Sequence, residues 1–540
     1  MKDRRKPCSL FVISRCAVAL LFFSGFTFST HRLFFTERYH PNLVASWITS
    51  TTEAISSDSS AARGISIGET VLFPDQVLIL LKYPPSSPLL TKDEIDCVYS
   101  SPNTSRRSSP LSIGGAYLDH QIVRCKLPSR GMIASVSLKP QGILPPGPIH
   151  YWKSLAYEAM IDRDNTTVVF AKGLNLRQGK TSNASKFQCV YGSDFTKPKL
   201  LLRTEVVSIA QEIVRCRTPL SLLSGPQNDN KVSIKVNGKG ILGSIARPEF
   251  LAPPDPPVFF QHRVCACTML RNQARFLHEW IMYHARIGVE RWFIYDNNSN
   301  DDIENIIESL VNKDFKITRH LWPWIKTQEA GFAHCALRAR DFCEWVAFID
   351  VDEFLHLPSG VHLGTLISNQ TIRPEVGELR ISCHNFGPSG LKSIPTEGVM
   401  VGYNCRLSMP ERHKSIVRPD KLNPSLINMV HHFDLKDGFR HVNVDRNLMV
   451  INHYKFQVWE VFKEKFYRRV AAYVSDWKDE ENVGSKDRAP GLGTQAVEPG
   501  DWSNRFCEVN DTGLRDWVVK TFRDPSTGLL PWQKQEDRVL

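Results

Sequence analysis

A short apolar run that ends in a cluster of acids is the feature of this sequence that most constrains its fold. Residues 345–349 are long enough for one buried strand, and Asp350-Val351-Asp352-Glu353 follows directly. A strand ending in Asp-x-Asp places two carboxylates at the carboxyl edge of a sheet, where α/β folds bind ligands. Neighbouring carboxylates repel each other unless a positive charge lies between them, and a hard divalent cation can also hold a diphosphate. The pattern predicts metal-assisted transfer from a nucleotide-activated donor, whereas Asp-x-Asp alone also occurs in solvated loops.

The residues around this cluster alternate between strand and helix patterns. Alternation of this kind, with right-handed crossovers, predicts a mostly parallel sheet with helices on both faces. Strands are expected at 264–270, 291–295, 315–321 and 345–349, and helices at 272–287, 301–312 and 327–343.

Asp296 follows the second of these strands, where an acid commonly meets a nucleoside. It also opens a good turn sequence, Asp-Asn-Asn-Ser-Asn, so a structural role is equally open.

Residues 71–250 have a different pattern of short β runs between Pro, Gly and Ser clusters, which predicts a β-sandwich-like module. The region contains an internal repeat: Cys-Val-Tyr at Cys97 and at Cys189 is followed by Ile-Val-Arg-Cys ending at Cys125 and at Cys216. The simplest interpretation is two similar units, each closed by one disulfide, although four cysteines allow three pairings. The module either binds glycan or acts as a scaffold.

The N-terminus predicts a membrane anchor. Basic residues in the tail (1–8) precede an apolar stretch at 9–29, which favours an uncleaved signal anchor with a cytosolic N-terminus; a cleaved signal peptide is the alternative. Residues 30–70 are expected to form a stem, and the Pro-rich segment 251–257 a linker to the domain at 258–530.

Cysteines and glycosylation sequons point to the same oxidising compartment. Of thirteen cysteines, Cys8 and Cys16 lie in the tail and anchor, so an odd number remains beyond them, which permits an intermolecular disulfide and a homodimer. Asn297 belongs to a sequon but is expected near the nucleotide, so we do not expect it to be glycosylated. The sequons are at Asn103, Asn165, Asn183, Asn297, Asn369 and Asn510.

The net charge of +11 is compatible with several anionic partners. We find no zinc-finger spacing, no RNA-binding signature and no long basic block after the first residues, so nucleic acid is not expected. An acidic glycan or a nucleotide diphosphate fits the charge equally well.

An ordered set of motifs in the C-terminal half resembles glycosyltransferase family 92, and with the anchor and the β-rich half the chain is similar to its plant pectic β-1,4-galactan synthases. The resemblance covers roughly residues 258–530. Its motifs are at 270–273, 276–284, 288–289, 294–297, 348–354, 384–390, 414–417 and 451–455.

The resemblance implies a GT-A type fold and an inverting transfer of galactose from UDP-galactose to β-1,4-galactan side chains of rhamnogalacturonan. It implies a single-pass type II Golgi membrane protein with a luminal catalytic domain, and manganese as cofactor. Asp350 and Asp352 would hold the metal against the UDP diphosphate and His453 would complete the site. The remaining donor contacts would come from Arg271 and Asp296 near the uridine and from Lys414 on phosphate.

Direct displacement needs one base to deprotonate the acceptor 4-hydroxyl. Glu411 is our candidate because it lies between the acidic tetrad and His453; the alternatives are Glu397, Asp434 and Asp511, and Glu411 could instead pair with Arg412 as an exposed carboxylate.

Three other patterns remain open. His431-His432 with Asp434 could form a second metal site, although neighbouring residues on a strand point to opposite faces. Residues 455–474 predict an amphipathic helix. Its default role is packing against the domain core, and the alternative is a surface for an anionic acceptor. The residues expected to face inward are Val458, Trp459, Phe462, Phe466 and Val470, and those expected to face outward are Lys463, Lys465, Arg468 and Arg469. Aromatic side chains for sugar stacking could come from Trp322, Trp324 or Trp502. A related transferase with another UDP-sugar or acceptor, and a non-catalytic glycan-binding protein, are the competing functions.

Overall fold

The computed structural model describes residues 64–84, 87–117, 120–139, 141–174, 176, 179–224, 230–250, 260–371, 373–473 and 497–533. The predicted tail and anchor, most of the stem and the Pro-rich linker lie outside these residues. Within them, no helix combines the length and the apolar composition that a membrane crossing needs. The first strand begins at Ser66, inside the predicted stem.

The first β unit is a sandwich of a five-stranded and a four-stranded sheet. Apolar side chains from both sheets form its core, and the Cys97–Cys125 disulfide joins β3 to β6 across it. Its strands are β1 (Ser66–Leu72), β2 (Gln76–Lys82), β3 (Ile95–Ser101), β4 (Thr104–Ser108), β5 (Ser112–Tyr117), β6 (His120–Lys126), β7 (Ile133–Leu138), β8 (Gly142–Ile143) and β9 (Ile149–Tyr151).

The second β unit has related strand pairings, but its strands are linked in one nine-stranded sheet. Its Ile-Val-Arg-Cys strand, β14, pairs antiparallel with β11, just as β6 pairs with β2, and Cys189–Cys216 joins β12 to β14. Both disulfides therefore follow the predicted pairing. The strands are β10 (Leu155–Ile161), β11 (Thr166–Lys172), β12 (Phe187–Gly192), β13 (Leu202–Ala210), β14 (Ile213–Arg217), β15 (Lys231–Val236), β16 (Gly240–Ile241), β17 (Gly243–Ser244) and β18 (Pro248–Phe250).

The C-terminal domain begins with the predicted alternation of strands and helices. Its first four strands are parallel and lie in the order β21-β20-β19-β22. The elements are β19 (His262–Leu270), α2 (Ala274–Ile287), β20 (Arg291–Asp296), α3 (Ile303–Val311), β21 (Ile317–Leu321), α4 (Gln328–Ala339) and β22 (Cys343–Phe348).

The other half of the sheet adds antiparallel pairs to the predicted, mostly parallel arrangement. β26 (His413–Val417) is antiparallel to both β22 and β24 (Val376–Asn385), and β30 (Val450–His453) is antiparallel to β23 (Glu353–His356). After β22 the strand–helix alternation stops, because no helix lies between β22 and β23, and parallel neighbours need such a crossover. The shorter elements are α5 (Leu363–Thr371), α6 (Val399–Gly402), β25 (Cys405–Arg406), β27 (Asn428–Met429), β28 (His432–Phe433), β29 (Arg440–Asn443), β31 (Val509–Asn510) and α8 (Gly513–Phe522).

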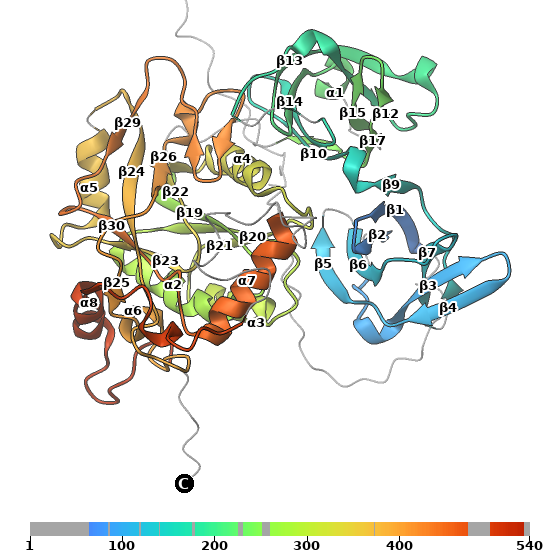
Figure 1. The fold of residues 1–540 in the computed structure, drawn as a ribbon. Coiled ribbons are helices and arrows are strands. Elements are labelled where there is room, and N and C mark those ends of the chain that lie inside the picture. The colour runs from blue at the N-terminus through green and yellow to red at the C-terminus, as the bar shows by residue number, and fades with distance from the viewer. Residues whose placement is uncertain are drawn as a thin grey trace, which may run out of the picture. The chain divides into compact units, whose positions relative to one another are not determined.

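Helices cover both faces of the parallel strands, as predicted. Alternate residues of β19 face opposite sides: Val264 and Ala266 pack with α2 and α3, whereas Cys265 and Cys267 pack with α4. Figure 1 shows α4 on the opposite side of the sheet from α2 and α3.

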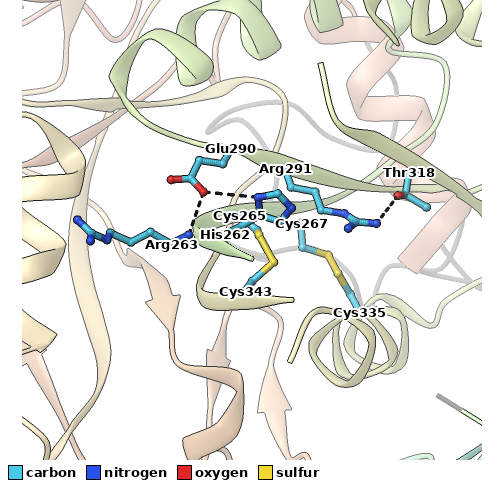
Figure 2. The surroundings of a disulfide bond; sticks show 9 residues. All are labelled: His262, Arg263, Cys265, Cys267, Glu290, Arg291, Thr318, Cys335 and Cys343. Atoms are coloured by element: carbon cyan, nitrogen blue, oxygen red, sulfur yellow. Dashed lines mark hydrogen bonds and ion pairs between the residues drawn. A yellow bond between two sulfur atoms is a disulfide. The ribbon is translucent and has the colours of Figure 1, made fainter. Parts of the chain in front are cut away.

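Two disulfides fix the α4 face of the sheet. Cys265 of β19 bonds to Cys343 of β22, and Cys267 bonds to Cys335 of α4 (Figure 2). At the start of the same strand, Glu290 Oε2 accepts a hydrogen bond from the Arg263 amide and lies 3.5 Å from His262 Nδ1. A further disulfide, Cys405–Cys507, joins the strand β25 to the residues before β31.

Cys383 is the free thiol of the described residues, and it is buried with 1% of its surface exposed. The odd cysteine had suggested an intermolecular disulfide. Burial excludes Cys383 from that role in the folded protein.

Three tryptophans named as candidates for sugar stacking are core residues instead. Trp322, Trp324 and Trp502 are each at most 1% exposed. Trp322 and Trp324 belong to the core on the α4 face, and Trp502 packs with aromatic side chains of α7 (Trp459–Tyr473).

Candidate active site at the end of β22

The turn between β22 and β23 carries the acidic cluster. Glu353 opens β23, and its Oε2 accepts a hydrogen bond of 3.0 Å from the Asp350 amide. Glu353 lies opposite His453 in the antiparallel pair of β23 and β30. The register between these two strands therefore brings His453 to the acids, across about a hundred residues of sequence.

His453 has a ring nitrogen that could serve as a metal ligand. Its Nε2 lies 3.5 Å from Asp352 Oδ2, is buried and has no hydrogen-bond partner. Burial, only partly offset by Asp352, lowers the pKa of His453 to about 3. The ring is thus a neutral imidazole, the form that binds metal ions.

Lys465 corrects the prediction for the helix at 455–474. It was assigned to the outward face, but its Nζ donates a hydrogen bond to Asp352 Oδ2 and its side chain is 13% exposed. Burial alone would raise the pKa of Asp352, but Lys465 and His453 together hold it well below its usual value. The signal was present in the sequence, because Lys465 lies four residues after Val461 and seven after Val458, on the buried side of the helix.

Lys414 lies between the other acids. Its Nζ is 3.2 Å from Asp350 Oδ2 and 2.7 Å from Glu353 Oε1. Burial favours protonated Asp350, but Lys414 and His431 outweigh it and lower the pKa of Asp350 to about 2. Burial raises the pKa of Glu353 to about 7 despite Lys414. In this structure Lys414 balances carboxylate charge, and its contact with a donor phosphate stays a prediction.

His431 is a residue of the cluster that sequence analysis placed elsewhere. Its Nε2 contacts Lys414 Nζ and lies 3.7 Å from Asp350 Oδ2, and its Nδ1 lies 2.9 Å from the Phe348 carbonyl. His432 points instead to Ser415 and Glu378. The two histidines do not converge on a second metal site.

Two carboxylates and an unpartnered imidazole nitrogen are suitable donors for manganese. The described residues nevertheless contain no three His, Cys, Asp or Glu side chains arranged as a ready-made metal site. Lysine ammonium groups contact the carboxylates in this structure. The donor set of Asp350, Asp352 and His453 therefore fits a divalent cation in its chemistry, and Lys465 would have to leave Asp352 for the ion to bind.

Glu411, the candidate base, lies next to this cluster. Its Oε2 accepts a hydrogen bond of 2.6 Å from Asn385 Nδ2 and is 3.5 Å from Lys455 Nζ. Asn385 is opposite His453 in the sheet, so Glu411 reaches the edge of the acidic cluster with about half of its side chain exposed.

The alternative bases have other partners. Glu397 pairs with Arg523, and Asp511 Oδ2 accepts a hydrogen bond of 2.6 Å from Arg406. Asp434 lies beyond the β27–β28 hairpin, where its amide donates to the Ile427 carbonyl. Among these four candidate bases, Glu411 is the one whose hydrogen-bond partner, Asn385, lies opposite His453 in the sheet.

Asp296 and its neighbours form a structured turn at the end of β20. The Asp296 carboxylate accepts hydrogen bonds from Arg319 at 2.7 and 3.0 Å and from the Ser299 amide at 2.8 Å. Asn297 Nδ2 donates to the carbonyls of Trp322 and Trp324, so the nitrogen of this sequon is already engaged. Its contacts thus give Asp296 a structural role, while its predicted approach to uridine is untested.

Arg271 directly follows β19 and is half-buried. Burial lowers the pKa of Arg124, on β6 of the first β unit, to about 10. The positive charge of Arg271 also contributes to this lowering. Arg271 and Asp296 thus stand at neighbouring carboxyl ends of parallel strands, where a nucleotide is expected.

A cavity of about 740 Å³ adjoins the cluster on the side of the antiparallel strands. Asp350, Lys414 and His431 line it together with residues of β24, α4 and the β27–β28 hairpin. This volume is typical of a ligand-binding pocket.

Comparisons with known proteins agree with the motifs. The glycosyltransferase family 92 model matches residues 261–483. A glycosyltransferase family 92 protein of Ricinus communis is 58% identical over 562 residues, covering 99% of this chain and 100% of that protein. One of Oryza sativa subsp. japonica is 51% identical and covers 92% of this chain and 89% of its own length. Among solved structures, a mannosyltransferase from Pyrobaculum calidifontis in complex with GDP-Man and Mn²⁺ shares 13% identity over 42% of this chain and 66% of its own, with a TM-score of 0.24, which is too low to support a conclusion.

Proposed function

This chain belongs to glycosyltransferase family 92, and we propose that it is an inverting galactosyltransferase that extends β-1,4-galactan on rhamnogalacturonan from UDP-galactose. The arrangement of Asp350, Asp352 and His453 at one end of β22 carries the proposal. Acids at that edge of a GT-A type sheet suit a metal-held diphosphate.

We propose that Asp350, Asp352 and His453 hold manganese, which would neutralise charge on the departing UDP. Glu411 takes the proton from the acceptor 4-hydroxyl as that oxygen bonds to the anomeric carbon of galactose. The bond from this carbon to the UDP oxygen breaks in the same step, and UDP leaves with the electron pair. Attack opposite the leaving group inverts the anomeric configuration.

The same proposal places the protein in the Golgi membrane, with residues 9–29 as its anchor and the catalytic domain in the lumen. The five disulfides among the described residues support an oxidising compartment. We propose no nucleic-acid partner, and the homodimer stays an expectation.

The full-length protein should be assayed with labelled β-1,4-galactopentaose, MnCl₂ and a set of UDP-sugars. We expect elongation with UDP-galactose, lost in Asp352→Asn and retained in the control Asp437→Asn, an exposed carboxylate outside the cluster. Transfer from a different UDP-sugar would reassign the donor. Oligosaccharide binding without transfer from any donor would identify a non-catalytic glycan-binding protein.

A further inference from the structure

Both β units share one apolar core with the catalytic domain. The buried cluster on the α4 face of the sheet draws side chains from all three parts: Ile122 of the first unit, Tyr157 and Phe170 of the second, and Trp322, Trp324 and Phe332 of the catalytic domain. The face of each β unit that enters this core is therefore the one turned to the catalytic domain.

Each β unit turns the arginine of its Ile-Val-Arg-Cys motif to the catalytic domain. On β6, Ile122 packs in the shared core, whereas Val123 belongs to the core of the first unit itself. Alternate residues of a strand face the same side, so Arg124 lies on the side of Ile122. In the second unit the counterpart, Arg215, donates a hydrogen bond of 3.1 Å to the Pro424 carbonyl of the catalytic domain.

The arginine of the second unit is neutralised within that unit. Arg215 is 4% exposed, and its Nη1 lies 2.8 Å from Asp162 Oδ2 and 3.5 Å from Asp164 Oδ1. The same nitrogen donates a hydrogen bond of 2.6 Å to Thr166 Oγ1. A buried guanidinium that is paired and hydrogen-bonded in this way has a structural role and needs no ligand.

Arg124 has the same position in the first unit but lacks this acid. The Phe73 amide donates to the Gln76 carbonyl in the β1–β2 hairpin, just as the Asp162 amide donates to the Thr166 carbonyl in the β10–β11 hairpin. Phe73 thus stands where the second unit has Asp162. Arg124 is nevertheless 7% exposed, and a buried charge without a partner is costly.

The acids near Arg124 do not replace the missing partner. Asp296 and Asp75 are the carboxylates whose charge acts on Arg124. The Asp296 carboxylate already pairs with Arg319, as does Glu304 beside it, and Asp75 is exposed to solvent.

Arg124 and Arg271 thus keep donors that the protein does not use. Arg124 Nε donates a hydrogen bond to Ser112 Oγ, directly opposite on β5. Within the described ranges, neither Arg124 nor the half-buried Arg271 forms an ion pair with an acid. A guanidinium has N–H donors and no acceptor, and two like charges repel each other. A ligand at this pair therefore has to bring both acceptor oxygens and negative charge.

The first β unit meets the catalytic domain at the edge of the sheet that carries the candidate active site. A Cβ atom on Gly115 of β5 would lie 3.8 Å from Glu304 Oε1, and one on Gly114 would lie 3.9 Å from Leu321 Cδ1. Leu321 ends β21 and Glu304 lies in the first turn of α3, so β5 reaches the carboxyl ends of the parallel strands. Arg271 follows β19 at this same edge, where α/β sheets bind nucleotides.

We propose that Arg124 and Arg271 form an anion site for the phosphate groups of the donor nucleotide, so that the first β unit completes the donor side of the catalytic domain. The inference rests on the proposed transferase function and adds to it a binding residue from outside the segment 261–483 that the family model matches. Arginine suits this role because its planar fork donates two parallel hydrogen bonds to phosphate oxygens.

Isothermal titration of UDP into the full-length protein, with MnCl₂ present, tests the site. Arg124→Gln should weaken UDP binding at least tenfold, because the amide keeps a hydrogen-bond donor but not the charge. Arg124→Lys keeps the charge without the planar fork, and we expect it to weaken UDP binding at least threefold.

The matched control is Arg215→Gln, at the same motif position of the second unit, which should leave UDP affinity unchanged. Thermal unfolding without UDP gives a second readout. The midpoint should fall further in Arg215→Gln, which takes a cation from the buried Asp162, than in Arg124→Gln, which removes a charge that has no acid partner. Loss of UDP affinity together with this order of midpoints supports the site.

Wild-type UDP affinity in folded Arg124→Gln would overturn the anion site, and if that variant does not fold, the same result in Arg124→Lys would do so. Loss of tetragalacturonate binding in Arg124→Gln with UDP affinity unchanged would assign the pair to an acidic glycan and also overturn the site. Absence of UDP binding in the wild-type protein would instead overturn the proposed transferase, so the two failures are distinguishable.

Discussion

Lys465 donates a hydrogen bond to Asp352 from a helix that lies 113 residues further along the chain. The ammonium group thus contacts a carboxylate that would also be a ligand of the proposed divalent cation. Asp352 needs a positive charge beside it, whether a lysine or a metal ion supplies it, because its carboxylate is buried beside two other acids.

Replacing Lys465 with methionine should tighten manganese binding. The change removes a competing cation but keeps much of the apolar stem, and we expect an affinity gain of about tenfold, or about 1.4 kcal/mol. Titration with MnCl₂ followed by water-proton relaxation measures this directly. Lys463→Met, an exposed position on the same helix, should leave the affinity unchanged. Equal or weaker affinity in Lys465→Met would show that the lysine does not compete with the ion.

His453→Gln should weaken manganese binding by at least about tenfold, since the neutral Nε2 is lost as a ligand. His362→Gln, an exposed histidine of the same domain, is the control. The same relaxation measurement applies. Unchanged affinity in His453→Gln would remove His453 from the ligand set and leave the two aspartates.

Glu411→Gln should lower kcat by about 10²–10⁴-fold with UDP affinity unchanged, because the amide keeps the shape but cannot accept the proton. Glu397→Gln tests an alternative base and should retain activity. Steady-state kinetics with galactopentaose, combined with UDP titration, separates catalysis from binding. Full activity in Glu411→Gln would move the role of the base to Asp434, Asp511 or Glu397.

Stability should depend on pH through Glu158. Burial raises its pKa from the ordinary value of 4.5 to about 8, despite the hydrogen bond from Trp324. The folded state therefore binds this proton more tightly than the unfolded state. The resulting stabilisation is complete below about pH 4.5 and is lost as the pH rises toward 8, by up to about 1.4 kcal/mol per pH unit.

Glu158→Gln has no proton to lose, so its free energy of unfolding should fall less between pH 5 and pH 8 than that of the wild-type protein. Urea unfolding at both pH values measures the difference. Glu205→Gln, an exposed position on the same β unit, should follow the wild-type curve. Parallel curves for Glu158→Gln and the wild-type protein would contradict the raised pKa.

Local sequence patterns were enough to predict the strands and helices that precede the acidic tetrad. The strand and helix alternation from Val264 to Phe348 is signalled by residues close in sequence, and so is the cysteine repeat in the β units. The antiparallel strands beyond Glu353 depend on pairings between distant segments, which no local period encodes. His431 was assigned to a different site for the same reason, because the fold, and no local pattern, brings the β27–β28 hairpin that carries it next to Lys414.

Lys465 is an exception, since the helical spacing did place it among buried positions. We predicted that Lys465 faces solvent because lysine is charged. The partner that makes its burial favourable, Asp352, is visible only in the folded chain.

The apolar core shared by the second β unit and the catalytic domain means that the Pro-rich linker divides the sequence without dividing the folding unit. A chain cut at residue 258 would leave Trp322, Trp324 and Phe332 without the side chains that cover them, and we expect it to aggregate. Intact, these two parts should melt together in one cooperative transition.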